Sequence, residues 1–261
     1  AESEVIGLNP RILQSGRHDS NFYHEMWQCI ARDDRWQGEI WNRRKNGEIY
    51  PESVSISVVR DTQGRVARYV STASDISQQK KNEEQIQVLA FSDPLTRLPN
   101  RRLLHDRLQH ALATSSRTKS HGALFFIDLD DFKTLNDTLG HDVGDLMLQQ
   151  VGQRLSGCMR DGDTVARLGG DEFVVVLEAL SVDPLVAATQ AESAGDKIMG
   201  TLRQPYQLAN GIYHSTPSVG VTLFADTHES TDELLKRADL AMYQAKSAGR
   251  NTLRFFDPMM Q

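Results

Sequence analysis

Two consecutive glycines stand between two apolar runs and constrain the fold of this chain more than any other feature. The stretch Arg167-Leu168-Gly169-Gly170-Asp171-Glu172-Phe173 follows Val165-Ala166 and precedes the apolar residues 174–177. Glycines between strand-like runs predict a tight hairpin that a second backbone or a ligand can approach closely. Asp171 and Glu172 would then lie on an exposed turn, where carboxylates suit a divalent metal. By itself the pattern predicts a hairpin with an acidic tip.

The composition is typical of a soluble globular protein. The chain has 261 residues, room for one large domain or two modest ones, with 39% hydrophobic and 25% charged residues. A net charge of −6 argues against a nucleic-acid-coating protein, and Cys29 and Cys158 lie too far apart for a zinc site. No run approaches membrane-spanning length and no signal peptide is visible, so we expect a cytoplasmic chain. Because it starts at Ala1, we expect a piece of a longer protein, whose other parts could tether it to a membrane.

The chain changes character near residues 76–92. This segment is polar and charged, with Ile76, Ile86 and Leu89 as its apolar points, which is typical of an exposed helix suited to pairing with a copy of itself. Asp93-Pro94 should end the helix, because the residue before a proline avoids the α region.

Strands dominate before this break, whereas strands and helices alternate after it. Before it we expect a helix over 22–30, a hairpin of 38–45 and 48–50 around Asn46-Gly47, a strand over 54–59, a turn at 61–64 and a strand through 69–70. After it we expect helices over 101–117, 143–159 and 187–202, strands over 123–127, 164–168, 173–177 and 216–224, and a last helix that a capping box at 230–233 opens and Gly249 closes. The alternation indicates an α/β layer fold in the second part.

Three aspartates follow the buried strand 123–127. Asp128 comes directly after it, so its carboxylate should emerge at the carboxyl end of the strand, where α/β sheets tend to bind ligands. Asp130 and Asp131 come next, and one of them is expected to cap the helix that begins near Phe132. Asp128 and the hairpin residue Asp171, on adjacent strands, would together suit Mg²⁺ beside phosphates.

Five ordered motifs carry a close family resemblance. They are Asp93-Pro94-Leu95-Thr96-x-Leu98-Pro99-Asn100-Arg101, Asp128-x-Asp130-x-Phe132-Lys133-x-x-Asn136-Asp137, Gly140-His141-x-x-Gly144-Asp145, Arg167-x-Gly169-Gly170-Asp171-Glu172-Phe173, and Ala238-Asp239-x-Ala241-Met242-Tyr243-x-Ala245-Lys246-x-x-Gly249-Arg250-Asn251. Over residues 91–256 the chain resembles the GGDEF domain of diguanylate cyclases, which join two GTP molecules into cyclic di-GMP and release two pyrophosphates. The resemblance implies a central, mostly antiparallel sheet surrounded by helices.

The resemblance also implies roles for individual residues. Mg²⁺, or Mn²⁺, would be held by Asp128, Asp171, Glu172 and the backbone carbonyl of Leu129, and Glu172 would serve either as metal ligand or as the base that takes the 3′-hydroxyl proton. Guanine would be recognised by Asn136 and Asp145, since a carboxylate accepts hydrogen bonds from the N–H edge of this base. The phosphates would be held by Lys133, Lys246 and Arg250 near the glycine turn Gly169-Gly170, with Lys133 counted as catalytic. For Lys246 and Arg250 the structural alternative is cations that favour a helix C-terminus.

Arg160 and Asp163 lie just upstream of the glycines, as Arg160-Asp161-Gly162-Asp163. The structural interpretation is a turn with a weak local ion pair. In the family, an Arg-x-x-Asp at this offset is the inhibitory site for the product, so the resemblance implies feedback by cyclic di-GMP.

The first part of the chain resembles a PAS sensory domain over residues 4–77. The likeness rests on the hairpin from Trp36 to Gly47 and on Asp75-Ile76-Ser77 leading into the linker. The two opening strands of such a domain are missing, and truncation would account for this. We therefore expect a PAS-like α/β domain at 1–77, a linker helix at 78–92 and a GGDEF domain at 93–257.

The product has twofold symmetry and each site holds one GTP, so two GGDEF domains would have to face each other as a homodimer. The PAS-like part and the linker helix would control their alignment.

The first alternative is a catalytically silent module that binds GTP or cyclic di-GMP. Residues 255–261 look like a junction to an EAL phosphodiesterase domain. The second alternative is a sensor with flavin or haem in the PAS-like part, where Trp36, Trp41 and Asn42 resemble flavin-binding relatives.

Overall fold

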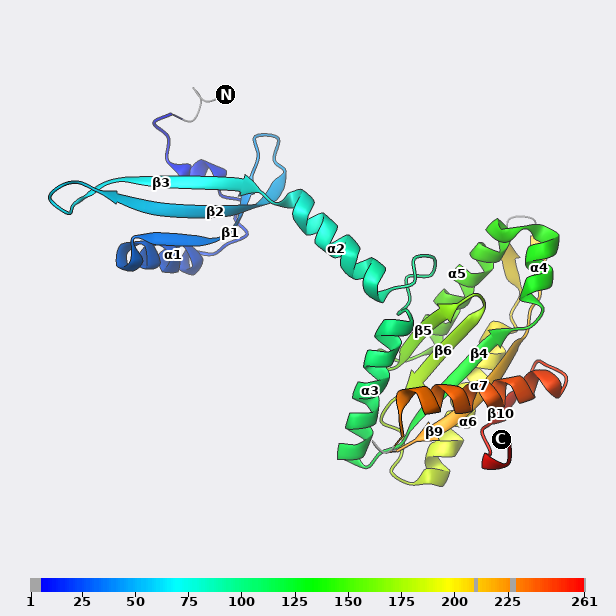
Figure 1. Ribbon diagram of the computed structural model, residues 1–261. Helices are drawn as coiled ribbons and strands as arrows, with labels where there is room; N and C mark the ends of the chain where they lie inside the picture. Colours follow the sequence, from blue (N-terminus) through cyan, green and yellow to red (C-terminus); the bar gives the residue numbers. More distant parts are fainter. Residues whose placement is uncertain (1–5, 209–210, 226–228, 261) are drawn as a thin grey trace. The chain divides into compact units, whose positions relative to one another are not determined.

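The chain forms two compact units, residues 1–86 and 87–261 (Figure 1). The computed structural model describes residues 6–208, 211–225 and 229–260, without the side chains at 84–87, 89 and 260. Its elements are η2 (Pro10–Leu13), α1 (Ser20–Asp33), β1 (Arg35–Arg43), β2 (Ile49–Arg60), β3 (Val66–Asp75), α2 (Ser77–Phe91), α3 (Arg101–Thr118), β4 (Gly122–Leu129), α4 (Phe132–Leu139), α5 (His141–Cys158), β5 (Thr164–Gly169), β6 (Glu172–Leu177), α6 (Pro184–Leu202), β7 (Tyr206–Leu208), β8 (Gly211–Tyr213), β9 (Pro217–Phe224), α7 (Thr231–Ser247), β10 (Leu253–Phe255) and η3 (Pro258–Met260).

The first unit is an antiparallel sheet in the order β1-β2-β3, packed against α1. Its small core joins Met26 and Ile30 of α1 to Ile40 of β1 and Val54 of β2. The hairpin forms as the Asn-Gly signal predicts, because Gly47 takes a positive φ of 90° that a side chain would disfavour. The helix expected at 22–30 is present and is longer, as α1.

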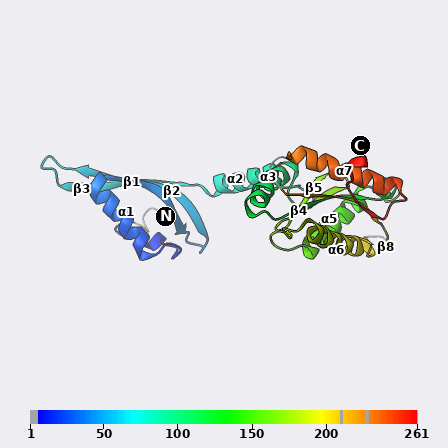
Figure 2. The same ribbon diagram turned by 90° about the horizontal axis from the view of Figure 1, so that it is seen from below.

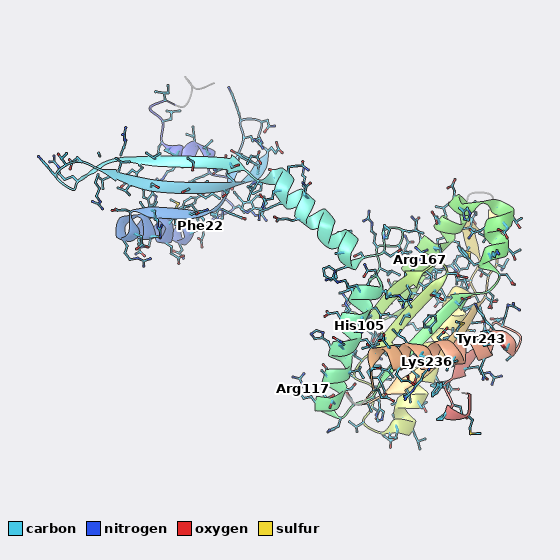
Figure 3. All side chains as sticks on the ribbon, viewed as in Figure 1. Phe22, His105, Arg117, Arg167, Lys236 and Tyr243 are labelled. Carbon is cyan, nitrogen blue, oxygen red and sulfur yellow. The ribbon has the colours of Figure 1, made fainter. Side chains whose placement is uncertain are left out.

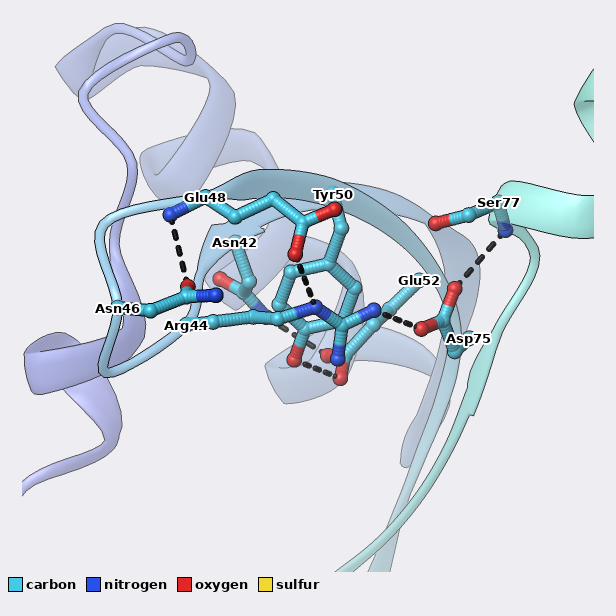
Figure 4. Close-up of polar contacts among 8 residues, drawn as sticks. All are labelled: Asn42, Arg44, Asn46, Glu48, Tyr50, Glu52, Asp75 and Ser77. Atoms are coloured by element: carbon cyan, nitrogen blue, oxygen red, sulfur yellow. Dashed lines mark hydrogen bonds and ion pairs between the residues drawn. The ribbon is translucent and has the colours of Figure 1, made fainter.

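Asp75 connects the sheet of the first unit to the start of α2 (Figure 4). Its carboxylate accepts a hydrogen bond from the Ser77 amide at 2.9 Å and forms an ion pair with Arg44. Arg44 also contacts Glu48 at 3.2 Å, and its guanidinium lies 3.8 Å above the Tyr50 ring. Hydrogen bonding from Ser77 and then Arg44 lowers the pKa of Asp75 to about 2, so this carboxylate stays ionised at ordinary pH and accepts from the first amide of α2.

The α2 helix matches the expected linker. The side chains of Ile86 and Leu89 lie outside the described residues, so pairing of this helix with a copy of itself stays a prediction. The boundary between the two compact units, at residues 86 and 87, falls within the predicted linker. The division into domains at 1–77, 78–92 and 93–257 stays a prediction. In the parts of the chain that the structure describes, no helix has the length and apolar character needed to cross a membrane.

The second unit has a five-stranded sheet in the order β10-β9-β4-β6-β5. Only β9 and β10 run parallel, so the expectation of a mostly antiparallel sheet surrounded by helices is confirmed. The strand β10 and the small β7-β8 pair are not among the elements expected from the sequence. These strands have three residues each, too short for an alternating pattern to be seen.

Helices cover both faces of this sheet, as the view in Figure 2 shows for α7 on one side and α5 and α6 on the other. The core between the sheet and α4, α5 and α6 includes Phe125, Ile127 and Met147. The opposite core, between the sheet and α3 and α7, includes Leu108 and Phe126. Because β4 is central and buried along its whole length, the position of its carboxyl end is fixed on both faces.

Neither Asp130 nor Asp131 caps α4 with its side chain, which corrects the expectation from the sequence. Asp131 occupies the N-cap position with a positive φ of 58° and makes no side-chain capping bond. The carboxylate of Asp130 is buried and bonds to Thr216 and Ser218 instead. An aspartate before a helix predicts a cap only when nothing else competes for the carboxylate, and here β9 does.

Candidate active site

The carboxyl end of β4 brings Asp128 between two neighbouring strands. Across the antiparallel ladders Asp128 is the partner of Glu172 on β6 and of Ser218 on β9. Residues directly opposite in such a ladder share a face, so Asp128 and Glu172 both lie on the face covered by α3 and α7. The prediction that the strand end and the glycine hairpin lie side by side is therefore confirmed by the register.

Lys246 of α7 forms an ion pair with Asp128. Its Nζ lies 2.8 Å from Oδ1 of Asp128, whose side chain is 9% exposed. The helix can come this close because Gly220 of β9 has no side chain: a Cβ there would lie 2.0 Å from the carbonyl oxygen of Ala238. A small residue in the sheet thus decides how near α7 brings its lysine.

Burial and like charges govern the ionisation of the carboxylates. Burial, with repulsion from Asp171 and Glu172, raises the pKa of Asp128 to about 6 despite the hydrogen bond from Lys246. Burial also raises the pKa of Glu172, helped by the charges of Asp239 and Asp171. Carboxylates gathered in a partly buried site create a negative potential, which attracts cations.

The glycine hairpin is as tight as the sequence predicts. Gly169 and Gly170 have φ of 148° and 51°, and a Cβ at either position would meet nothing within 4 Å. Asp171 follows in the turn and Glu172 opens β6, and both are half-buried rather than fully exposed. The backbone of the turn is consequently open to close approach at both glycines.

The side chain of Arg167 donates hydrogen bonds to this turn, a contact that the sequence does not predict. Its Nε and Nη2 donate to the Gly170 carbonyl at 3.1 and 2.7 Å, while Nη1 lies 2.9 Å from Oδ1 of Asp93. Burial opposes the ionisation of Asp93, but hydrogen bonds from Thr96 and Arg167 outweigh it and lower its pKa. Figure 3 labels Arg167 beside the strands of the second unit. No pattern in the sequence pairs residues 74 positions apart, so only the fold reveals this link.

Asn136 and Asp145, expected to bind guanine, come from α4 and α5. Oδ1 of Asn136 is buried and has no hydrogen-bond partner, which costs free energy unless a donor is supplied. Gly144 makes room for it, since a Cβ there would lie 1.9 Å from that oxygen. Asp145, one residue further on, is exposed. The pair therefore offers one buried and one exposed acceptor to a ligand.

The remaining phosphate candidates are exposed. Lys133 lies in the first turn of α4, and Arg250 lies in the loop after α7 with its Nε 3.9 Å from Oδ1 of Asp131. Lys246 and Arg250 do stand at the C-terminal end of α7, so the helix-dipole interpretation holds for their position, but the side chain of Lys246 reaches Asp128. Among the predicted site residues, the structure joins Lys246 to Asp128 by an ion pair and places Asp128 opposite Glu172 in the β4–β6 ladder.

Arg160 and Asp163 form a turn away from these residues, between α5 and β5. Oδ2 of Asp163 accepts a hydrogen bond from the Arg160 amide at 3.0 Å, and the Arg160 side chain is exposed. Beside the turn lies a cleft of about 430 Å³. Its lining comprises residues 161–164 together with Asp106, Arg107, His110 and Glu178. The lining of this cleft includes Asp163 of the predicted inhibitory pair.

The carboxylates fit a divalent metal in their chemistry. Asp128, Asp171 and Glu172 supply the hard oxygen ligands that Mg²⁺ prefers. Within the described ranges, however, no three His, Cys, Asp or Glu side chains are gathered closely enough to hold a metal ion. The cation in contact with Asp128 in this structure is the Lys246 ammonium.

The aromatic residues considered for flavin binding make internal contacts in the first unit. Trp36 packs edge-on against Phe22, and Arg17 lies 3.8 Å over the ring of Trp41. Asn42 donates to Glu52 at 2.8 Å (Figure 4). These contacts give each of the three side chains a role in packing, and cofactor binding stays a prediction.

Both parts of the chain match known protein families. The family described as "Diguanylate cyclase, GGDEF domain" matches residues 90–252, and the family described as "PAS domain" matches residues 1–78. The bifunctional diguanylate cyclase/cyclic di-GMP phosphodiesterase MucR of Pseudomonas aeruginosa is 44% identical over 181 residues, which are 69% of this chain and 25% of MucR. The diguanylate cyclase TpbB of the same species is 40% identical over 63% of this chain and 37% of TpbB. The chain thus spans well under half the length of these relatives.

Solved structures agree with these matches. The isolated GGDEF domain of TpbB superimposes with a TM-score of 0.59 and 36% identity, over 65% of this chain and 96% of that domain. The coiled coil and GGDEF domain of DgcB from Caulobacter crescentus, in complex with c-di-GMP, gives a TM-score of 0.61 and 26% identity, over 69% of this chain and 93% of that one.

Proposed function

The chain belongs to the GGDEF diguanylate cyclase family and carries a PAS domain ahead of the GGDEF domain, and from this premise we propose that it condenses two GTP molecules into cyclic di-GMP and two pyrophosphates. The observation that carries the proposal is the cluster of Asp128, Glu172 and Lys246 beside the open backbone of Gly169-Gly170. It combines carboxylates for a metal, a cation for phosphate and room for both.

Each residue has an assigned task. Asn136 and Asp145 bind the guanine, because the N1–H and N2–H groups of this base are donors that suit two acceptors. A guanine in this position would also give the buried Oδ1 of Asn136 the hydrogen-bond partner that it lacks. Lys133, Lys246 and Arg250 hold the β- and γ-phosphates, with Lys246 and Arg250 flanking the end of α7. Together these contacts orient the α-phosphate of one GTP at the glycine turn.

Asp128, Asp171, Glu172 and the Leu129 carbonyl would hold Mg²⁺ or Mn²⁺. When bound, the metal supplies charge neutralisation at the α-phosphate and a lower pKa for the attacking 3′-hydroxyl. Glu172, whose pKa is raised by burial, stands at the same edge and suits proton acceptance from that hydroxyl.

The reaction needs a second copy of the chain. One site binds one GTP, so the attacking 3′-hydroxyl must come from the nucleotide in a facing domain, and a homodimer is part of the mechanism. The PAS domain and α2 are assigned to control this alignment. Arg160 and Asp163 are assigned to product feedback, because the exposed guanidinium can stack on guanine and bind phosphate beside the cleft.

The test is incubation of the protein with GTP and Mg²⁺, followed by chromatography of the products. Cyclic di-GMP should form with the wild-type chain and be lost with Asp171→Ala, while Asp137→Asn, an exposed carboxylate of α4, should leave turnover unchanged. If the wild-type chain binds GTP but forms no product at high protein concentration, the proposed cyclase activity is wrong and a nucleotide-binding regulatory role takes its place.

A further inference from the structure

The loop that carries Arg250 has an unfavourable backbone. Gly249, Arg250 and Asn251 have successive positive φ values of 110°, 63° and 48°. For residues other than glycine this region is unfavourable, so surrounding contacts must hold the loop in place. Two groups on opposite sides of the loop provide these contacts.

Asp130 holds the loop from inside. It is 6% exposed, and its Oδ2 accepts hydrogen bonds from the Asn251 amide at 3.0 Å and from the Thr216 hydroxyl at 2.6 Å. Its Oδ1 accepts from the fully buried Ser218 hydroxyl at 2.7 Å. Both carboxylate oxygens are therefore engaged with the start of β9 and with the loop.

Arg203, at the end of α6, holds the loop from outside. Its Nε donates to Oδ1 of Asn251 at 2.7 Å and its Nη2 donates to the Asn251 carbonyl at 2.9 Å. Asn251 is consequently fixed at its amide, its carbonyl and its side chain. The neighbouring Arg250 keeps a side chain that is 54% exposed.

We propose that Asp130 is a positioning residue for Arg250. By fixing Asn251 it sets the backbone from which the Arg250 guanidinium reaches the β- and γ-phosphates of GTP, and Arg203 completes the clamp. The inference rests on the proposed function, since it takes Arg250 as a phosphate-binding residue. It gives Asp130 a task different from that of Asp128, because both oxygens of the Asp130 carboxylate accept hydrogen bonds from the protein itself.

Two substitutions of Asp130 distinguish positioning from metal binding. Asp130→Ala removes every acceptor. Asp130→Asn keeps a carbonyl oxygen for Asn251 and Thr216, and the Ser218 hydroxyl can turn to accept from the new amide. A positioning residue is thus rescued by Asn, whereas a metal ligand that needs its charge is not.

The experiment measures binding of a GTP analogue with a methylene between its α- and β-phosphates, in the presence of Mg²⁺, by calorimetry. We expect Asp130→Ala to weaken binding by about 10-fold or more, as loss of one charge-assisted contact does, and Asp130→Asn to stay within about 3-fold of wild type. Binding of GMP, which has no β- or γ-phosphate, should be unchanged in both. Combined with Arg250→Ala, the Asp130→Ala change should weaken binding no further.

Arg203→Ala tests the clamp from its exposed side, in case Asp130→Ala fails to fold. It should also weaken binding of the analogue and add nothing to Arg250→Ala, while Arg254→Ala, an exposed arginine of β10, should have no effect. Three results would each overturn the inference. The first is an equal loss of affinity for the analogue in Asp130→Asn and Asp130→Ala, and the second is full additivity of Asp130→Ala with Arg250→Ala. The third is unchanged binding in both Asp130→Ala and Arg203→Ala. If the wild type binds no analogue, the proposed function fails and the inference fails with it.

Discussion

At the scale of single residues, Asp128 is a carboxylate whose environment differs strongly from water. Burial and its carboxylate neighbours raise its pKa from 3.8 to about 6, so the folded protein binds this proton more tightly than the unfolded chain does. A raised pKa contributes stability that is fully present below the unfolded value and is lost as pH rises through the folded value. Between these two pH values the carboxylate becomes charged in an unfavourable site.

This predicts a pH-dependent difference between the wild type and Asp128→Asn in metal-free protein. From about pH 4 to pH 7 the free energy of unfolding of the wild type should fall relative to the variant by roughly 2–3 kcal/mol. Urea unfolding followed by circular dichroism measures it. All three tryptophans, Trp27, Trp36 and Trp41, lie in the first unit, so their fluorescence monitors that unit separately. A difference that stays constant with pH would show that Asp128 is not perturbed.

Gly144 gives a second prediction at this scale. A methyl group there would displace Oδ1 of Asn136, which lies 1.9 Å from the Cβ position, so Gly144→Ala should weaken GTP binding by about 10-fold or more, the value of one lost hydrogen bond. Gly157→Ala is the matched control, because it lies on the same helix and its Cβ would meet nothing within 4 Å. Calorimetric titration with GMP measures the base contact alone. Equal affinities of the two variants would remove Asn136 from guanine recognition.

At the scale of elements, Arg167 connects the turn that follows α2 to the glycine hairpin. Its side chain is 10% exposed and bonds to both Asp93 and the Gly170 carbonyl. Lysine has the charge but not the planar fork, so it cannot satisfy both partners. The hairpin and the entry to α3 therefore depend on one guanidinium.

Arg167→Lys is predicted to lower the free energy of unfolding of the second unit by about 3 kcal/mol, as breaking a buried pair does, and to reduce turnover at a temperature where the variant is folded. Arg117→Lys, an exposed change on α3, is the control and should shift stability by no more than about 0.5 kcal/mol. Urea unfolding and initial rates measure the two effects. If Arg167→Lys keeps the turnover of the wild type, the contact between Arg167 and Asp93 is not needed for the function of the hairpin.

The elements also show how far sequence reasoning extends. Glycine at 47 and at 169–170, the capping box at Ser230 and the long amphipathic helices are local signals, and the structure has a hairpin, a tight turn and a helix N-cap in those places. The sequence does not predict the role of Asp130, because its partners, Thr216, Ser218 and Asn251, are more than 80 residues away. The Arg167–Asp93 contact is unpredictable for the same reason. Local propensity predicts elements, while buried polar contacts between distant segments need the fold.

At the scale of the whole molecule, control by the PAS domain is expected to act on alignment of two copies rather than on nucleotide binding. Deletion of residues 1–80 should therefore change turnover much more than the KM for GTP, because every proposed GTP-binding residue lies beyond position 127. Steady-state kinetics of the deleted and full chains measure both constants. Equal changes in the two would assign residues 1–80 a role in GTP binding itself.

The central claim is that each site is half of a catalytic centre, and a mixing experiment tests it most directly. Wild-type protein at fixed concentration is incubated with GTP and Mg²⁺ while folded Asp171→Ala is added. If two intact sites must face each other, an equal amount of the variant should leave about half of the wild-type turnover and a threefold excess about a quarter, because random pairing captures wild-type chains in mixed dimers. Turnover that is indifferent to the added variant would contradict the account.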